Sequence, residues 1–90
     1  MLDEPSWELQ KERPMALIIA ISEKIGTRDP VLISNYMKKL IKLNSWIGSF
    51  SLLLSENPEE ISKLIKDIDL GVMPRRELVK KVFDIISKFE

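Results

Sequence analysis

The stretch from Asp29 to Ser55, DPVLISNYMKKLIKLNSWIGSFSLLLS, carries the most regular apolar pattern of the chain. Its larger apolar side chains recur at alternating spacings of three and four residues: Ile33, Tyr36, Leu40, Leu43, Ile47, Phe50 and Leu54. This spacing is typical of a helix that packs against other helices. The stretch therefore predicts one long central helix over about residues 30–55, or two helices broken near the middle, where Gly48 weakens the helix.

Proline residues mark the starts of most of the other predicted helices. Asp29-Pro30 and Asn57-Pro58 each combine an N-cap residue with a proline at the first helical position, where its missing N–H has no helical acceptor. The remaining helical segments are expected at residues 14–25, 58–70 and 74–89. Because only residues 71–74 connect the last two helices, we expect them to be antiparallel neighbours.

The segment from Met15 to Ile21, MALIIAI, is apolar at every position. A helix that is hydrophobic on all sides is surrounded by protein, so we expect a central core helix that ends at Gly26, with a partner-binding helix as the alternative. Residues 1–13 are expected to form a short helix or an N-terminal arm that can move. Together the segments predict an all-α fold, a compact single-domain bundle of four to five helices over residues 1–90.

The composition excludes most kinds of active site. The chain has no cysteine and no histidine, which rules out disulfides, thiolate or histidine metal sites, and Ser-His-Asp or Cys-His catalysis within it. Carboxylate chemistry stays formally open, but the close pair Asp67 and Asp69 would point in different directions on a helix. We therefore expect a non-catalytic protein with no metal, no cofactor and no small-molecule substrate.

The charges of the chain are balanced, with 14 basic and 14 acidic side chains. No global field draws the protein to nucleic acid or anionic lipid, so binding of that kind needs a local patch. The N-terminus lacks the features of a signal peptide, and the longest apolar run is far shorter than a bilayer span. We expect a cytoplasmic protein without membrane contact. The abundance of Ile, Leu, Lys and Glu is typical of a thermophile.

The last predicted helix carries the first candidate binding site, which comprises Arg75, Arg76, Lys80 and Phe83. None of its three basic residues follows an acidic residue by four positions, so none has a favourable partner within the helix. Arg76 and Lys80 are like charges one turn apart, and Phe83 lies at the margin of the expected buried face. A solvated surface, a protein contact and a phosphate contact all remain open for this group.

The second candidate site lies on one flank of the central helix and comprises Lys39, Lys42 and Trp46, beside Lys38. At about 100° per residue, Trp46 lies far from the centre of the apolar stripe, so the main core does not cover it. A tryptophan beside lysines can serve as an interface hot spot or as a stacking platform for bases. Alternatively, the N-terminal arm folds over Trp46 through Trp7 or Leu9.

Two functions are compatible with these features. The first is a non-catalytic interaction subunit that docks on a larger protein through an exposed apolar flank and a few basic residues. The alternative is a small nucleic-acid-binding helical domain that uses one of the two basic groups. The neutral overall charge and the lack of a clear recognition helix weigh against the alternative.

Two segments of the chain, SWELQKERPMALIIAISEKIGTRDP at residues 6–30 and GVMPRRELVKKVFD at residues 71–84, add a resemblance. With the length and proline-spaced layout of the whole chain, they resemble the small helical accessory subunits of crenarchaeal family-B replicative DNA polymerase holoenzymes. This resemblance implies an archaeal protein of DNA replication that binds the polymerase and modulates its synthesis without an active site of its own. It assigns no role to individual residues.

Overall fold

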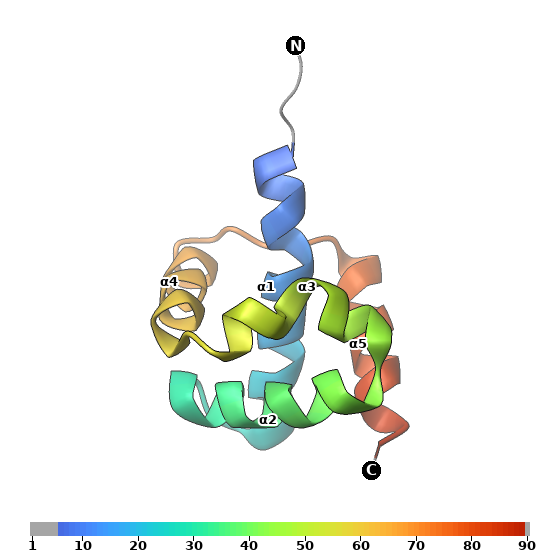
Figure 1. The fold of residues 1–90 in the computed structure, drawn as a ribbon. Helices are drawn as coiled ribbons and strands as arrows, with labels where there is room; N and C mark the ends of the chain where they lie inside the picture. Colours follow the sequence, from blue (N-terminus) through green and yellow to red (C-terminus); the bar gives the residue numbers. More distant parts are fainter. Residues whose placement is uncertain (1–5, 90) are drawn as a thin grey trace.

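The computed structural model describes the backbone of residues 6–89 and the side chains of residues 11–89. Within this part of the chain every regular element is a helix, which confirms the predicted all-α bundle (Figure 1). The helices are α1 (Ser6–Ile25), α2 (Pro30–Leu43), α3 (Ser45–Ser55), α4 (Pro58–Asp69) and α5 (Arg76–Ser87).

Helix α1 is the central element, because it packs against each of the other four helices. In Figure 1 it runs behind α2 and α3, which both pass across it, with α4 on one side and α5 on the other. Most of the segment 15–21 is fully buried, as its apolar sequence predicts. Helix α1 continues through Pro14, so residues 6–13 form its first turns rather than a separate arm. It ends at Gly26, whose φ of +71° suits glycine.

The sequence left open one long helix over residues 30–55 or two helices broken near the middle, and the structure shows the second. Helix α2 ends at Leu43 and α3 begins at Ser45, with Asn44 between them in an extended conformation. The Asn44 side chain accepts a hydrogen bond from the Ile47 N–H at 3.2 Å. Asn44 is therefore the N-cap of a new helix. The break lies at this residue and not at Gly48, which sits inside α3.

Helices α2 and α3 fold back on each other as an antiparallel hairpin, held close by small residues. A Cβ placed on Gly48 would lie 3.4 Å from Cγ2 of Ile41, so the two helices are already near contact distance there. At the other end of the hairpin, the buried Ser34 hydroxyl donates to the Ser55 carbonyl at 2.8 Å. Small residues at both ends of the hairpin therefore permit a close approach of α2 and α3.

The hairpin also divides the predicted apolar stripe. Ile33, Leu40 and Ile47 are buried, but Leu43 at the end of α2 is 61% exposed. Met37, which is not part of the stripe, is fully buried. The stripe assumed one straight helix with one buried face, whereas α2 turns different residues toward α1 and α3.

The predicted antiparallel pairing of the last two helices, α4 and α5, is wrong. Helix α5 packs mainly against α1, whereas α4 packs against α2, α1 and α3. Figure 1 shows the connection between them, residues 70–75, crossing from one side of α1 to the other. The physical reason is that α1 is apolar on all sides and offers each helix its own surface. Helix α5 starts at Arg76 rather than Pro74, and Phe89 beyond its end is exposed.

Candidate functional site

The first predicted site loses one of its basic residues to an ion pair. Arg75 is the N-cap of α5, and its backbone N–H donates to Oε2 of Glu12 at 2.9 Å. Its Nε donates to the same oxygen at 3.1 Å. Glu12 belongs to α1, so the pair ties the start of α5 to the central helix. Arg75 is thereby neutralised, which makes it a poor candidate for a phosphate contact.

The other three members of the first site differ in exposure and in what they contact. Arg76 and Lys80 are exposed on α5, and neither forms an ion pair within residues 11–89. Phe83 is half-buried and packs against the core, so it supports the fold more than it presents a surface. Only Arg76 and Lys80 therefore remain as available basic groups at this site.

Trp46 of the second site is held among side chains from three helices. Its ring lies edge-on to Phe50 of α3, with 5.0 Å between the ring centroids. The Lys81 ammonium of α5 lies 4.4 Å from the ring centroid, and the Arg13 guanidinium carbon of α1 lies 5.6 Å from it. The ring is thus half-buried and engaged by two cations, which leaves little room for a stacked base. The side chains of Trp7 and Leu9 lie outside the described residues.

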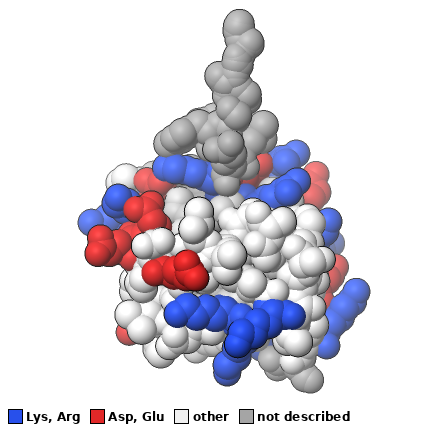
Figure 2. All heavy atoms as spheres, viewed as in Figure 1, with Lys and Arg blue, Asp and Glu red and all other residues white. Residues whose placement is uncertain are grey.

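The break at Asn44 separates Trp46 from the lysines predicted to accompany it. Lys39 and Lys42 are exposed on α2, and Lys42 instead lines a shallow groove along the open side of the α2–α3 hairpin. This hairpin groove has a volume of about 270 Å³ and is lined by Lys38, Ile41, Lys42, Leu52, Ser55 and Glu56. Figure 2 shows basic side chains gathered along α2, beside a broad surface over α3 that carries no charge.

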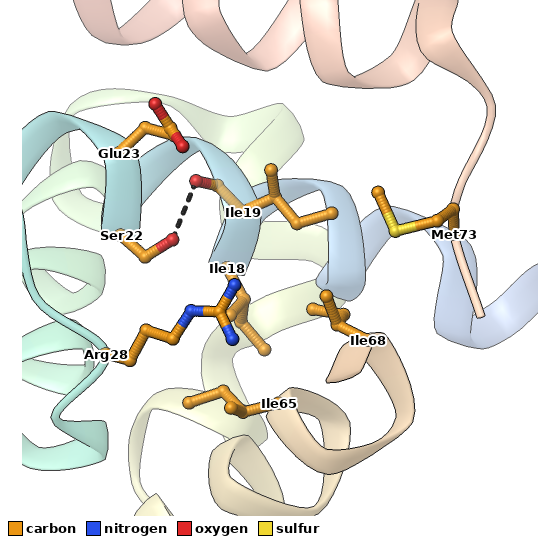
Figure 3. Close-up of a pocket in the computed structure, with 8 residues that line it drawn as sticks. All are labelled: Ile18, Ile19, Ser22, Glu23, Arg28, Ile65, Ile68 and Met73. Atoms are coloured by element: carbon orange, nitrogen blue, oxygen red, sulfur yellow. Dashed lines mark hydrogen bonds between the residues drawn. The ribbon is translucent and has the colours of Figure 1, made fainter. Parts of the chain in front are cut away.

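A second hollow lies between α1, α4 and the connection to α5 (Figure 3). This connection pocket has a volume of about 160 Å³ and is lined by Ile18, Ile19, Ser22, Glu23, Arg28, Ile65, Ile68 and Met73. Figure 3 shows Arg28 and Met73 reaching toward it from opposite sides. The Ser22 hydroxyl donates to the Ile19 carbonyl at 2.9 Å, and Arg28 pairs with Asp69. The remaining lining is mostly isoleucine.

Beside the connection pocket, three large apolar side chains are exposed to solvent. Leu70 is 83% exposed, Met73 62% and Val72 52%. They lie in a connection between helices, where polar residues are more common. Leaving all three exposed to water is unfavourable unless a partner covers them. Sequence reasoning missed this surface. The signal was present in the apolar letters L, V and M of residues 70–73 between two helices.

Sequence reasoning also missed the hairpin groove as a unit. Its signal is the absence of any acidic residue from Pro30 to Ser55, a stretch that contains Lys38, Lys39 and Lys42. Only the fold-back at Asn44 places Leu52 opposite the two groove lysines. The groove and the connection pocket are two of the surfaces in the described part of the chain that could bind a partner.

Within residues 11–89 there is no cluster of three or more acidic side chains that could hold a metal ion. None of the helices in the described part of the chain combines the length and hydropathy that crossing a membrane requires. Comparison of the chain with protein-family models, curated proteins and solved structures gave no match.

Proposed function

We propose that this protein is a non-catalytic subunit that binds a larger protein through apolar side chains exposed on its surface. The observation that carries this proposal is the group formed by Leu70, Val72 and Met73 in the connection between α4 and α5. Each of these side chains is more than half exposed, and Met73 also lines the connection pocket beside several isoleucines. A patch of this kind next to a pocket is typical of a protein contact.

The charges around the connection pocket favour a protein partner over nucleic acid. Arg28 is the basic residue at the pocket, and its guanidinium already pairs with the Asp69 carboxylate. Glu23 adds a negative charge to the rim. A phosphate would therefore meet no available cation there, whereas an apolar side chain would meet Ile18, Ile65 and Ile68. We infer that the partner inserts an apolar side chain into this pocket.

The alternative function, binding of nucleic acid through a local basic patch, has less support. Arg75 is engaged by Glu12, and Trp46 is engaged by Lys81, so each predicted patch has lost a member. Sequence-tolerant binding to single strands relies on an accessible aromatic face next to basic residues. The described residues offer no such combination at Trp46.

A family-B replicative DNA polymerase is the first partner to test. The proposal rests on the resemblance of the chain to small helical accessory subunits of such polymerases. In that role the protein would bind the polymerase and alter its synthesis without contributing a reactive group. Any larger protein with an exposed apolar side chain remains a suitable partner for the connection pocket.

The test is purification of the tagged full chain from its native extract, followed by mass spectrometry and reconstitution with the purified partner. We expect one stoichiometric partner, and we expect Leu70→Ser combined with Met73→Ser to abolish its recovery. Leu43→Ser is the control, because Leu43 is about as exposed as Met73 but lies at the end of α2. A protein that elutes alone at every salt concentration would contradict the proposal, as would equal losses from both variants.

A further inference from the structure

The charge of the protein is unevenly divided between its helices. From Pro30 to Ser55 the chain has three lysines and no acidic residue, so the α2–α3 hairpin is positive. The whole chain is neutral, so the rest of it is negative by the same amount. None of the three lysines forms an ion pair within residues 11–89. Within the described residues, the hairpin therefore combines three basic side chains with no acidic side chain and no ion pair.

Two of these three lysines border the hairpin groove. Lys38 and Lys42 lie one helical turn apart on α2, on the side that faces Leu52 of α3 across the groove. The floor between them is formed by Ile41 and the buried Ser55. Leu52 is 52% exposed, so the groove has an apolar wall that no described helix covers. In Figure 1 no described helix lies in front of the hairpin.

We infer that the hairpin groove binds an acidic amphipathic helix of the partner protein. This inference rests on the proposed function, because it names the chemistry of a segment of that same partner. Leucine or similar side chains of the segment would contact Ile41 and Leu52. Carboxylates spaced one turn apart would lie against Lys38 and Lys42.

A helix fits the groove better than an extended segment. Two antiparallel helices leave a furrow that accepts a third helix along its length, with anchors at i, i+3, i+4 and i+7. The groove is lined over about one turn of each helix, by residues 38–42 of α2 and 52–55 of α3, so one to two turns of a partner helix lie over it. An added strand would need exposed backbone groups to pair with, and both helices of the hairpin satisfy theirs internally.

The partner must be acidic for electrostatic reasons. Two lysines on one rim attract carboxylates and repel a basic segment, because like charges brought together across an interface disfavour binding. Glu56 at the far end of the groove limits the positive stretch to about two turns. A nucleic acid backbone would extend over that carboxylate, which makes a short acidic helix the better match.

The test uses the isotope-labelled full chain and two synthetic helical peptides with the length of α2, 14 residues. One peptide carries leucines along one face and glutamates four residues apart beside them, and the other carries lysines in place of the glutamates. We expect saturable NMR shifts at Ile41 and Leu52 with the acidic peptide only. Lys38→Glu with Lys42→Glu should weaken its binding at least about tenfold.

The matched control is Lys80→Glu with Lys88→Glu, which makes the same change of charge on exposed residues of α5. Because neither residue lines the groove, the control should change the affinity less than about twofold in physiological salt. Equal binding of both peptides would overturn the inference, and so would equal effects of the two variants. Tighter binding of a short DNA at the same amides would assign the groove to nucleic acid instead.

Self-association is the remaining outcome that would overturn the inference. If the same amides shift with protein concentration alone, the acidic helices of a second copy occupy the groove.

The partner experiment separates the two proposals. A partner that is lost with Leu70→Ser and Met73→Ser but kept by Lys38→Glu and Lys42→Glu supports the proposed function and overturns the groove assignment. If the acidic peptide binds in the groove but no partner is recovered, the groove assignment is supported and the proposed function is overturned.

Discussion

The Lys81 ammonium of α5 lies 4.4 Å from the centroid of the Trp46 ring at the start of α3. Helix α5 packs mainly on α1, so this contact is one of the few that join it to the hairpin. Arg13 of α1 approaches the same ring, which makes the indole the meeting point of three helices that are distant in sequence. Trp46, which was predicted as an exposed binding residue, thus connects α3 to α1 and α5.

The contact between Lys81 and Trp46 should contribute measurably to stability. Lys81→Gln removes the cation, and a partly exposed cation–π contact is worth about 0.5–1 kcal/mol. We expect the free energy of unfolding in urea to fall by that amount with an unchanged m-value. Lys80→Gln is the control, because Lys80 is also exposed on α5 but contacts no ring or acid within residues 11–89. Equal losses from the two variants would show that only net charge matters.

The interior of α3 should accept a side chain at Gly48. A Cβ there would be 3.4 Å from Cγ2 of Ile41, which is ordinary van der Waals contact. Alanine favours the helix over glycine by about 1 kcal/mol, so Gly48→Ala should raise the thermal midpoint. Gly48→Leu should lower it, because a larger side chain would push α2 and α3 apart at a cost of about 1–3 kcal/mol. A loss with alanine would mean that the hairpin is packed more tightly than this distance indicates.

Helix boundaries that depend on local chemistry could be predicted from the sequence. Asp29 accepts the Val31 N–H at 2.9 Å, as expected of an N-cap before a proline, and Gly26 ends α1. The burial of the segment 15–21 follows from its composition alone. The break at Asn44 could not be predicted in the same way, because the apolar spacing from Leu40 to Ile47 continues in phase across it. Gly48 was the more conspicuous residue, yet the side-chain cap at Asn44 determines where the helix breaks.

The candidate site was harder to predict, because its contacts join residues that are far apart in sequence. Arg75 and Glu12 are 63 positions apart, and spacing rules within one helix say nothing about such a pair. The same holds for Lys81 and Trp46. The chain does reveal which residues are candidates for exposure, such as the apolar residues of the connection. It does not reveal that α5 leaves α4 and packs on α1, which is what exposes them.

The cap at Asn44 should be necessary for the hairpin. Asn44→Ala removes the acceptor for the Ile47 N–H, and loss of such a cap costs about 1 kcal/mol of stability. Asn44→Asp retains the acceptor and should unfold at nearly the wild-type urea concentration. The Cα chemical shifts of residues 43–46 report whether the backbone still breaks there. Helical shifts running through residue 44 in the wild-type protein would contradict the hairpin itself.

The ion pair between Glu12 and Arg75 should be asymmetric in its effect on stability. Glu12 is the more buried partner, with its side chain 16% exposed against 65% for Arg75. Its carboxylate also accepts the Arg75 backbone N–H, close to the positive end of the α5 dipole. Arg75→Gln removes only the side-chain donor, and an exposed ion pair contributes at most about 1 kcal/mol. Glu12→Ala removes both acceptor roles, so we expect a loss of about 1–2 kcal/mol in urea unfolding.

A double-mutant cycle distinguishes these roles of Glu12. If the carboxylate acts mainly on the backbone of α5, Arg75→Gln should add little in the Glu12→Ala background. Hydrogen exchange of the first amides of α5 should then accelerate with Glu12→Ala and stay near the wild-type rate with Arg75→Gln, because only the former exposes the start of the helix. Equal losses from the two single variants would instead show that the side-chain ion pair alone fastens α5 to α1.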